Sequence, residues 1–341
     1  MLAICYTSYG SLTSLSLREI PSPTPGPGEV LVEVHAAALH IADSFAVRGA
    51  PWVMRLYTGL LRPKFGVPGF DLAGIVKSTG PGVWRFQPGD AVFGIGQGTC
   101  AEEAIASESA LAPLPPSLSF SEAAALPTSG LAALHALRDA ANLQPGQELL
   151  IIGASGGIGS YAIQMARSMG AHVTGVCGPT NLDYIRSLGA HQAIDYTTQD
   201  FAYPPAQYDV ILDNVENRPL ADCRQALRSH GTLLLNSGTG ATGLPFLVRL
   251  CKPLLLAPFA RPQRLRRYLS NPNASDLATL SEMVWSGTLR PTISRRYPLT
   301  ETATALAHIE TGHAQGKVVI EIRPEASRVE HEHDAHASLA V

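Results

Sequence analysis

The alternation of apolar and polar residues changes character near residue 125. Before that point, short apolar runs are separated by proline and glycine clusters, and Gly28–His35 alternates with a period of two, as a half-buried strand does. After it, short apolar runs alternate with stretches whose apolar residues recur every three or four positions. The first part therefore predicts an antiparallel β domain with few helices, and the second predicts a parallel, doubly wound sheet.

The second part can be divided into individual elements. Its apolar runs predict strands at Leu149–Ile152, His172–Cys177, Gln192–Ile194, Tyr208–Asp213 and Thr232–Asn236. Helical periodicity predicts helices from Ile158 to about Gly170, at Asn181–Leu188 and at Leu220–Leu227. Strand-like patterns at Leu289–Leu299 and Gly316–Ile322, around a helix at Ala303–Ile309, predict that the chain returns to the β domain. We therefore assign residues 1–123 and 263–341 to the β domain and residues 124–262 to the second domain, and expect 324–341 to be a disordered tail.

The glycine cluster after the first strand of the second domain predicts a dinucleotide site. Residues 148–159 read Glu-Leu-Leu-Ile-Ile-Gly-Ala-Ser-Gly-Gly-Ile-Gly, so a tight turn joins a strand to a helix. Such a turn lets backbone N–H groups and a helix N-terminus approach a pyrophosphate. Ala154 replaces the first glycine of the usual fingerprint, and the alternative interpretation is a loop without function. The flanking strand and helix favour the dinucleotide site.

Ligands of doubly wound sheets lie beyond the carboxyl ends of the strands. The rim of the site is therefore expected at Gly153–Gly159, Cys177–Asn181, Asp213–Val215 and Asn236–Gly238. The candidate cofactor-binding residues from this rule are Gly153, Ser155, Gly156, Gly157, Ile158, Gly159, Cys177, Thr180, Asn181, Tyr196, Asn214 and Ser237.

The end of the second strand predicts which nicotinamide cofactor is used. NAD-specific sites usually place an acidic residue there for the ribose hydroxyls, but Cys177-Gly-Pro-Thr-Asn181 contains none. A pocket without an acid accepts a 2′-phosphate, to which Thr180, Asn181, Tyr196 and Arg186 could donate hydrogen bonds. We therefore expect NADPH to be preferred over NADH.

Composition favours an enzyme that acts on small molecules. The 341 residues are 45% hydrophobic and carry a net charge of −3, which gives no reason to expect nucleic acid. Five scattered cysteines form no Cys-x-x-Cys pair, which argues against a disulfide framework and a structural zinc site. The first residues lack a basic segment, so no signal peptide and a cytoplasmic location are expected.

The most apolar stretch, Phe246–Ala260, is interrupted by charges and prolines and is too broken to span a bilayer. We therefore expect no membrane partner. A buried or interface strand around Leu254–Leu256 is the favoured interpretation, and it suggests a homodimer through that edge. Three histidines in Glu330–His336 could bind metal weakly, but a solvated tail is the favoured interpretation.

Five strings together resemble the medium-chain dehydrogenase/reductase superfamily, and more narrowly its zinc-independent quinone-oxidoreductase and enoyl-reductase branch. They are Ala36–Asp43, Pro68–Gly74, Gly153–Gly159, Asp213–Val215 and Gly312–Lys317. The resemblance covers about residues 1–322 and implies a GroES-like β domain beside a Rossmann domain. It also implies that Lys317 contacts the cofactor and that no metal is bound. Zinc-dependent relatives carry metal ligands where this chain has His40 and Phe70, and phenylalanine cannot ligate zinc.

The resemblance implies an NADPH-dependent transfer of hydride to a carbonyl-conjugated double bond or a quinone. The alternatives are a metal-free alcohol/carbonyl oxidoreductase and a nucleotide-binding protein with lost or altered catalysis. Many relatives have asparagine at His40 and tyrosine at Phe45, both facing the nicotinamide, so a remodelled substrate site is expected. His40 either donates a proton or hydrogen bond to the substrate carbonyl or merely bonds within the cleft wall. Phe45, Trp52 and Tyr57 are expected to line a pocket for a small hydrophobic substrate, although ordinary core packing explains about half of the apolar residues at 52–61.

Overall fold

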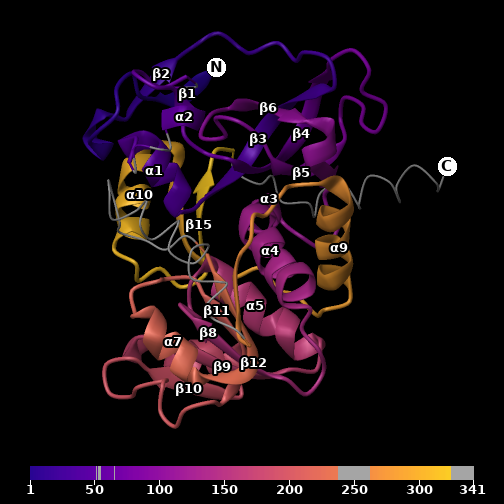
Figure 1. Cartoon of the computed structure of the whole chain (residues 1–341). Coiled ribbons are helices and arrows are strands. Elements are labelled where there is room, and N and C mark those ends of the chain that lie inside the picture. Colours follow the sequence, from indigo (N-terminus) through magenta and orange to yellow (C-terminus); the bar gives the residue numbers. More distant parts are fainter. Residues whose placement is uncertain (51, 53–54, 65, 237–261, 324–341) are drawn as a thin grey trace, which may run out of the picture.

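The computed structural model describes residues 1–50, 52, 55–64, 66–236 and 262–323. Within these residues the chain forms two domains, one above the other in Figure 1. The N-terminal strands and the last described strand form the upper, β domain, and the central part of the chain forms the lower domain. The chain thus leaves the β domain and returns to it, as the sequence predicts.

The lower domain contains a six-stranded sheet in the order β10-β9-β8-β11-β12-β13, with all neighbours parallel. Its strands are β8 (Glu148–Ile152), β9 (His172–Cys177), β10 (Gln192–Asp195), β11 (Tyr208–Asp213), β12 (Leu227–Leu235) and β13 (Arg264–Arg267). The five strands predicted from the apolar runs are all present. β12 begins earlier than expected, because Leu227 already pairs with Tyr208. A register shift follows this pair, and residues 228–230 of β12, which lie within it, are exposed.

β13 lies outside the boundary that the sequence suggested for this domain. Its Arg264–Arg267 backbone pairs in parallel with Thr232–Leu235 of β12. The nucleotide-binding sheet therefore extends beyond residue 262. The sequence did not predict β13 as a strand of this sheet, because three of its four residues are arginines, which a buried parallel strand rarely contains.

Helices cover this sheet, and local signals fix their ends. α5 begins after Gly156 in extended geometry and ends before Gly170, whose φ of 78° is in the left-handed region. The described α-helices of this part are α4 (Pro127–Leu134), α5 (Gly157–Ser168), α6 (Leu182–Ser187), α7 (Leu220–Ala226) and α9 (Ala274–Trp285). A π-helix, His135–Ala141, continues α4.

The β domain is built on a sheet in the order β14-β15-β3-β4-β5-β7, with β6 paired to β3. Neighbouring strands are antiparallel except β14 and β15. The strands are β3 (Glu29–Leu39), β4 (Asp71–Thr79), β5 (Ala91–Ile95), β6 (Glu103–Ser107), β7 (Leu111–Pro113), β14 (Ile293–Pro298) and β15 (Lys317–Glu321). β1 (Leu2–Cys5) and β2 (Ser16–Glu19) form a separate antiparallel pair. The helices beside these strands are α1 (Ile41–Arg48), α2 (Arg55–Thr58), α3 (Phe120–Ala124) and α10 (Thr302–Glu310).

The two domains share one hydrophobic core, which fixes their relative position. One buried cluster contains Phe93 of β5 together with Leu149 of β8 and Tyr161 of α5. The Tyr161 hydroxyl is fully buried and donates to the carbonyl of Ala125, at 3.0 Å. Because close packing transmits displacement, the cofactor turn and the β domain are held in one arrangement.

Three predictions fall outside the described residues: the strand around Leu254–Leu256, the cofactor contact of Ser237, and the tail at 324–341. No helix of the described part is both long and apolar enough to cross a membrane.

Candidate active site

The turn after β8 has the geometry that a pyrophosphate site needs. Gly153 has a φ of 75°, which favours glycine. A Cβ on Gly159 would lie 2.3 Å from the Gly153 carbonyl oxygen, so no larger residue fits the start of α5. A Cβ on Gly156 would have no heavy atom closer than 3.6 Å, so the outer side of the turn is open. The N-terminus of α5, including Ile158, thus faces space into which a phosphate fits.

The strand order brings the other predicted rim residues to the same edge. β9, β8, β11 and β12 are successive neighbours, so their carboxyl ends lie side by side. The Asn214 side chain donates to the Ile152 carbonyl at 3.3 Å and accepts from Asn236 at 3.3 Å. The predicted rim is therefore one continuous edge, at least as far as Asn236.

A segment of the β domain that ends at Lys317 contacts the glycine turn. The backbone N–H of Gly316 donates to the Ser155 carbonyl at 2.8 Å. The Asn181 side chain donates to the Ser155 hydroxyl at 3.1 Å and accepts from Gln315. Gln315 is thus a site residue that strand-end reasoning missed, although it lies within the Gly312–Lys317 string.

The end of β9 offers polar groups and no free acid to a ribose. Thr180 is exposed, Tyr196 is 56% exposed and its ring lies beside Gly178, and Asn181 is buried. Asp195, the register partner of Cys177, accepts from the backbone N–H and hydroxyl of Thr197, at 2.9 and 2.8 Å. The Cys177 side chain is buried, and this burial raises the pKa of its thiol to about 11. The Arg186 guanidinium binds Asp183 at 2.8 Å, on α6.

Lys317 lies beside the glycine turn and is paired with a buried acid. Its ammonium group lies 3.1 Å from the Asp71 carboxylate, and the two side chains are 2% and 0% exposed. Asp71 also accepts from the backbone and hydroxyl of Thr128. A Cβ on Gly157 would lie 3.1 Å from Cδ of Lys317. Lys317 therefore lies against the glycine turn with its charge balanced by Asp71, and its contact with the cofactor stays a prediction.

His40 lies at the N-terminus of α1 and is almost enclosed. Its backbone N–H donates to the Asp43 carboxylate at 2.8 Å, which caps the helix. Its ring stacks on Phe70, with centroids 5.7 Å apart and an angle of 11° between the planes. Nδ1 lies 3.5 Å from the Asp43 carboxylate, while the buried Nε2 has no hydrogen-bond partner among the described residues.

Asp43 is fully buried, and this burial raises the pKa of its carboxyl group, whereas the neighbouring His40 lowers it. Asp43 next to Nδ1 favours the tautomer in which that nitrogen carries the proton. Nε2 is then the ring atom left to exchange a proton or a hydrogen bond with a ligand.

The three predicted substrate-pocket residues lie in different parts of the chain: Phe45 in α1, Tyr57 in α2, and Trp52 between these helices. Phe45 is half-buried on α1, and Trp52 is 48% exposed. The Tyr57 side chain lies outside the described part, although its backbone belongs to α2. Of these three, only Phe45 is placed on the same helix as the site around His40.

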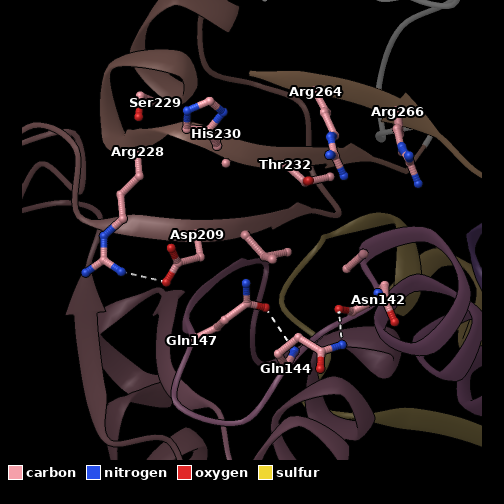
Figure 2. A pocket seen from close by; sticks show the side chains of 13 residues that line it. Asn142, Gln144, Gln147, Asp209, Arg228, Ser229, His230, Thr232, Arg264 and Arg266 are labelled. Atoms are coloured by element: carbon pink, nitrogen blue, oxygen red, sulfur yellow. Dashed lines mark hydrogen bonds and ion pairs between the residues drawn. The ribbon is translucent and has the colours of Figure 1, made fainter. Parts of the chain in front are cut away.

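A separate hollow of about 640 Å³ lies at the amino ends of the strands, opposite the cofactor edge. Figure 2 shows that Arg228 points to Asp209, with which it forms an ion pair of 2.7 Å. The Gln147 side chain accepts from the backbone N–H of Gln144 at 2.9 Å. These polar side chains are thus engaged in contacts within the protein. We therefore keep the candidate active site at the carboxyl ends of the strands.

Comparison with known proteins shows the family. The chain matches the alcohol dehydrogenase GroES-like domain over residues 26–143 and the zinc-binding dehydrogenase family over residues 188–320. It is 33% identical to a chloroplastic quinone oxidoreductase of Triphysaria versicolor, over 94% of this chain and 98% of that protein. The chain belongs to the medium-chain dehydrogenase/reductase superfamily.

Further relatives place it in the quinone-oxidoreductase and enoyl-reductase branch, so it is an oxidoreductase. It is 31% identical to the 2-methylene-furan-3-one reductase of Solanum lycopersicum, over 94% of this chain and 79% of that protein. The quinone oxidoreductase from Coxiella burnetii superposes with a TM-score of 0.81 at 30% identity, covering 95% of this chain and 99% of that one. The Triphysaria relative is named as chloroplastic, so a cytoplasmic location of this chain stays a prediction.

Glu216 follows Asp213-Asn-Val215 at the carboxyl end of β11. Its φ of 53° is in the left-handed region, which favours glycine over a residue with a side chain. The buried Glu216 carboxylate accepts two hydrogen bonds from Arg267 of β13, each 2.9 Å long. A bidentate ion pair of this kind offsets a backbone cost of about 1–2 kcal/mol. The pair joins the carboxyl ends of β11 and β13.

We expect the purified protein to contain no stoichiometric zinc and to keep its activity in a chelator. Phe70 offers no donor atom, and no group of three or more metal-ligating side chains occurs in the described residues. Elemental analysis before and after dialysis against EDTA measures this. One zinc per chain, with activity lost on its removal, would contradict the assignment.

Proposed function

We propose that this oxidoreductase uses NADPH, without zinc, to reduce an activated double bond or a quinone of a hydrophobic small molecule. The observation that supports the proposal is the stacking of His40 on Phe70, because the resemblance implies that zinc-dependent relatives carry metal ligands at these two positions. Without a Lewis acid, the chemistry suited to the site is hydride transfer to the β-carbon of an enone or to a quinone, followed by protonation. NADPH supplies the hydride when bound.

The residues at the carboxyl edge fit that cofactor. The open side of Gly156 and the N-terminus of α5 would receive the pyrophosphate. Thr180, Tyr196 and Asn181 would surround the adenosine ribose, and their lack of an acidic partner favours a 2′-phosphate. A nicotinamide cofactor is also supported by a relative, since the mouse protein that is 30% identical is named as an NAD(P)H oxidoreductase.

His40 would then act on the oxygen or the α-carbon of the substrate. The centroids of the His40 and Phe70 rings are 5.7 Å apart, so the two rings form one largely apolar wall. The buried Nε2 of His40 is the polar atom of this wall that has no hydrogen-bond partner among the described residues. With a proton on Nε2, the ring would donate a hydrogen bond to the oxygen on which negative charge develops, and Asp43 would orient the ring through Nδ1. The name of the Solanum relative, a reductase of a methylene conjugated to a ketone, supports an enone as the substrate class.

A panel of quinones, enals and saturated aldehydes tests the reaction class. We expect NADPH oxidation with quinones or enals and none with saturated aldehydes. Turnover of the aldehydes alone would instead indicate a metal-free carbonyl reductase. Tight NADPH binding without turnover of any compound would indicate a nucleotide-binding protein.

NADPH is expected to bind more tightly than NADH. Thr180→Asp would place a carboxylate beside the 2′-phosphate, and we expect it to weaken NADPH roughly tenfold, about 1.4 kcal/mol, while leaving NADH nearly unchanged. Thr180→Ser is the matched control because it keeps the hydroxyl. Fluorescence titration of both cofactors measures the dissociation constants, and a clear preference of the wild type for NADH would refute the assignment.

The proposed homodimer through Leu254–Leu256 and the cytoplasmic location remain predictions.

A further inference from the structure

The segment after α1 exposes a group of large apolar side chains, which we call the apolar loop: Trp52, Leu56, Leu60 and Leu61. Their exposed fractions are 48, 66, 63 and 87%. Among the described residues, eleven large hydrophobic side chains are exposed, and four of them fall within these ten positions. The other seven are scattered from Leu2 to Trp285. Concentrated apolar exposure of this kind usually marks an interaction surface.

The apolar loop is attached to the β domain by other residues. The Tyr9 hydroxyl hydrogen-bonds the Thr58 hydroxyl at 2.8 Å and the Gly59 carbonyl at 2.5 Å. The Arg55 guanidinium lies 4.7 Å from the centre of the Tyr9 ring and donates to the Gly49 carbonyl at 3.0 Å. Thr58 is only 3% exposed. The inner side of the segment is therefore occupied by polar anchors, and its leucines are left on the outside.

The charge around the apolar loop has one sign. Between Asp43 and Asp71 the chain has four basic residues and no acidic one, although the net charge of the whole chain is −3. Arg48 is paired with Glu310. Arg62 and Lys64, directly after Leu61, are both exposed. Leucine and tryptophan side chains flanked by cations are the composition of surfaces that bind anionic bilayers.

We infer that the apolar loop docks on the surface of a bilayer that contains anionic phospholipids. The leucines and Trp52 would enter the region between headgroups and acyl chains, and Arg62 and Lys64 would meet the phosphates. A second copy of the chain is a poorer occupant, because a two-fold interface would bring the same cations close to each other. Docking differs from spanning, so the broken Phe246–Ala260 stretch does not argue against it.

This inference replaces the expectation that the protein has no membrane partner. The sequence favoured core packing for about half of the apolar residues at 52–61, and four of them, Trp52, Leu56, Leu60 and Leu61, are exposed in the structure. Docking would also have a consequence that rests on the proposed function. α1, which precedes the loop, begins next to His40, so a hydrophobic substrate dissolved in the bilayer could be taken up beside the active site.

Co-sedimentation of the full chain with vesicles tests the docking without cofactor or substrate, so its outcome is independent of the proposed activity. We expect binding to phosphatidylcholine vesicles containing phosphatidylglycerol, weaker binding to phosphatidylcholine alone, and a decrease with added salt. The double variant Leu60→Ser/Leu61→Ser should bind at least roughly tenfold more weakly. Arg62→Glu/Lys64→Glu should lose the preference for anionic vesicles.

Trp84→Ser is the matched control, because Trp84 is 82% exposed but lies in the connection between β4 and β5. It should bind vesicles like the wild type, and thermal unfolding should show that every variant is folded. Absence of vesicle binding by the wild type, or equal binding by the leucine variant, would overturn the inference. A dimer that dissociates on Leu60→Ser/Leu61→Ser would overturn it as well, because the patch would then belong to a second copy.

Discussion

Replacing His40 with alanine should lower kcat/KM about 10²-fold, which corresponds to about 2.7 kcal/mol of transition-state stabilisation. The affinity for NADPH should be nearly unchanged, because the imidazole lies on the β domain and not on the glycine turn. The fold should also survive, because the helix cap uses the backbone N–H of His40, which alanine retains. Steady-state kinetics on an enone and titration with NADPH separate the two effects.

His40→Asn is the informative companion variant. It would restore the residue that is common in the quinone-oxidoreductase branch, so we expect better turnover of quinones and poorer turnover of the native substrate. If His40→Ala kept near wild-type rates on that substrate, the ring would be only a wall of the cleft. Proton delivery would then fall to water.

Replacing Gly159 with alanine should damage both the fold and the cofactor site. The added Cβ would lie 2.3 Å from the Gly153 carbonyl oxygen and 2.7 Å from the backbone of Ala154, neither of which can move without reshaping the turn. We expect the free energy of unfolding to fall by about 1–3 kcal/mol. Because the misplaced turn no longer matches the pyrophosphate, NADPH should bind at least roughly tenfold more weakly.

Gly156→Ala is the control in the same turn. Its φ of −77° is accessible to alanine, and the new Cβ would have no protein atom closer than 3.6 Å. Stability should therefore be preserved, while NADPH binding should weaken because the methyl group occupies the place of a phosphate. Unchanged NADPH affinity in this variant would show that the pyrophosphate lies elsewhere.

Much of the fold and the cofactor edge could be predicted because strong local patterns determine them. Tyr208–Asp213 and His172–Cys177 match their observed strands because apolar runs of that length, closed by polar residues, form buried parallel strands. The glycine turn could be predicted because Gly153 and Gly159 meet backbone constraints that only glycine satisfies. The strand-end rule then brought Asn214 and Asn181 to one edge.

The remaining features depend on contacts between distant parts of the chain. Lys317 is 246 residues from Asp71, and no local pattern shows that the two charges neutralise each other. Glu216 meets Arg267 across the end of β12, which the sequence could not reveal because β13 has the composition of an exposed loop. The exposure of Leu60 and Leu61 is also set by tertiary structure, since Tyr9 and Thr58 decide which side of the segment faces inward.

The most direct test of the proposed reaction is the position of deuterium in the product. The protein would be incubated with an enone and NADPH that carries deuterium at the transferable position of C4, and the product would be analysed by NMR. We expect a saturated ketone with deuterium on the β-carbon and a solvent proton on the α-carbon. Deuterium on the carbinol carbon of an allylic alcohol would contradict it, because the protein would then reduce the carbonyl group and not the conjugated double bond.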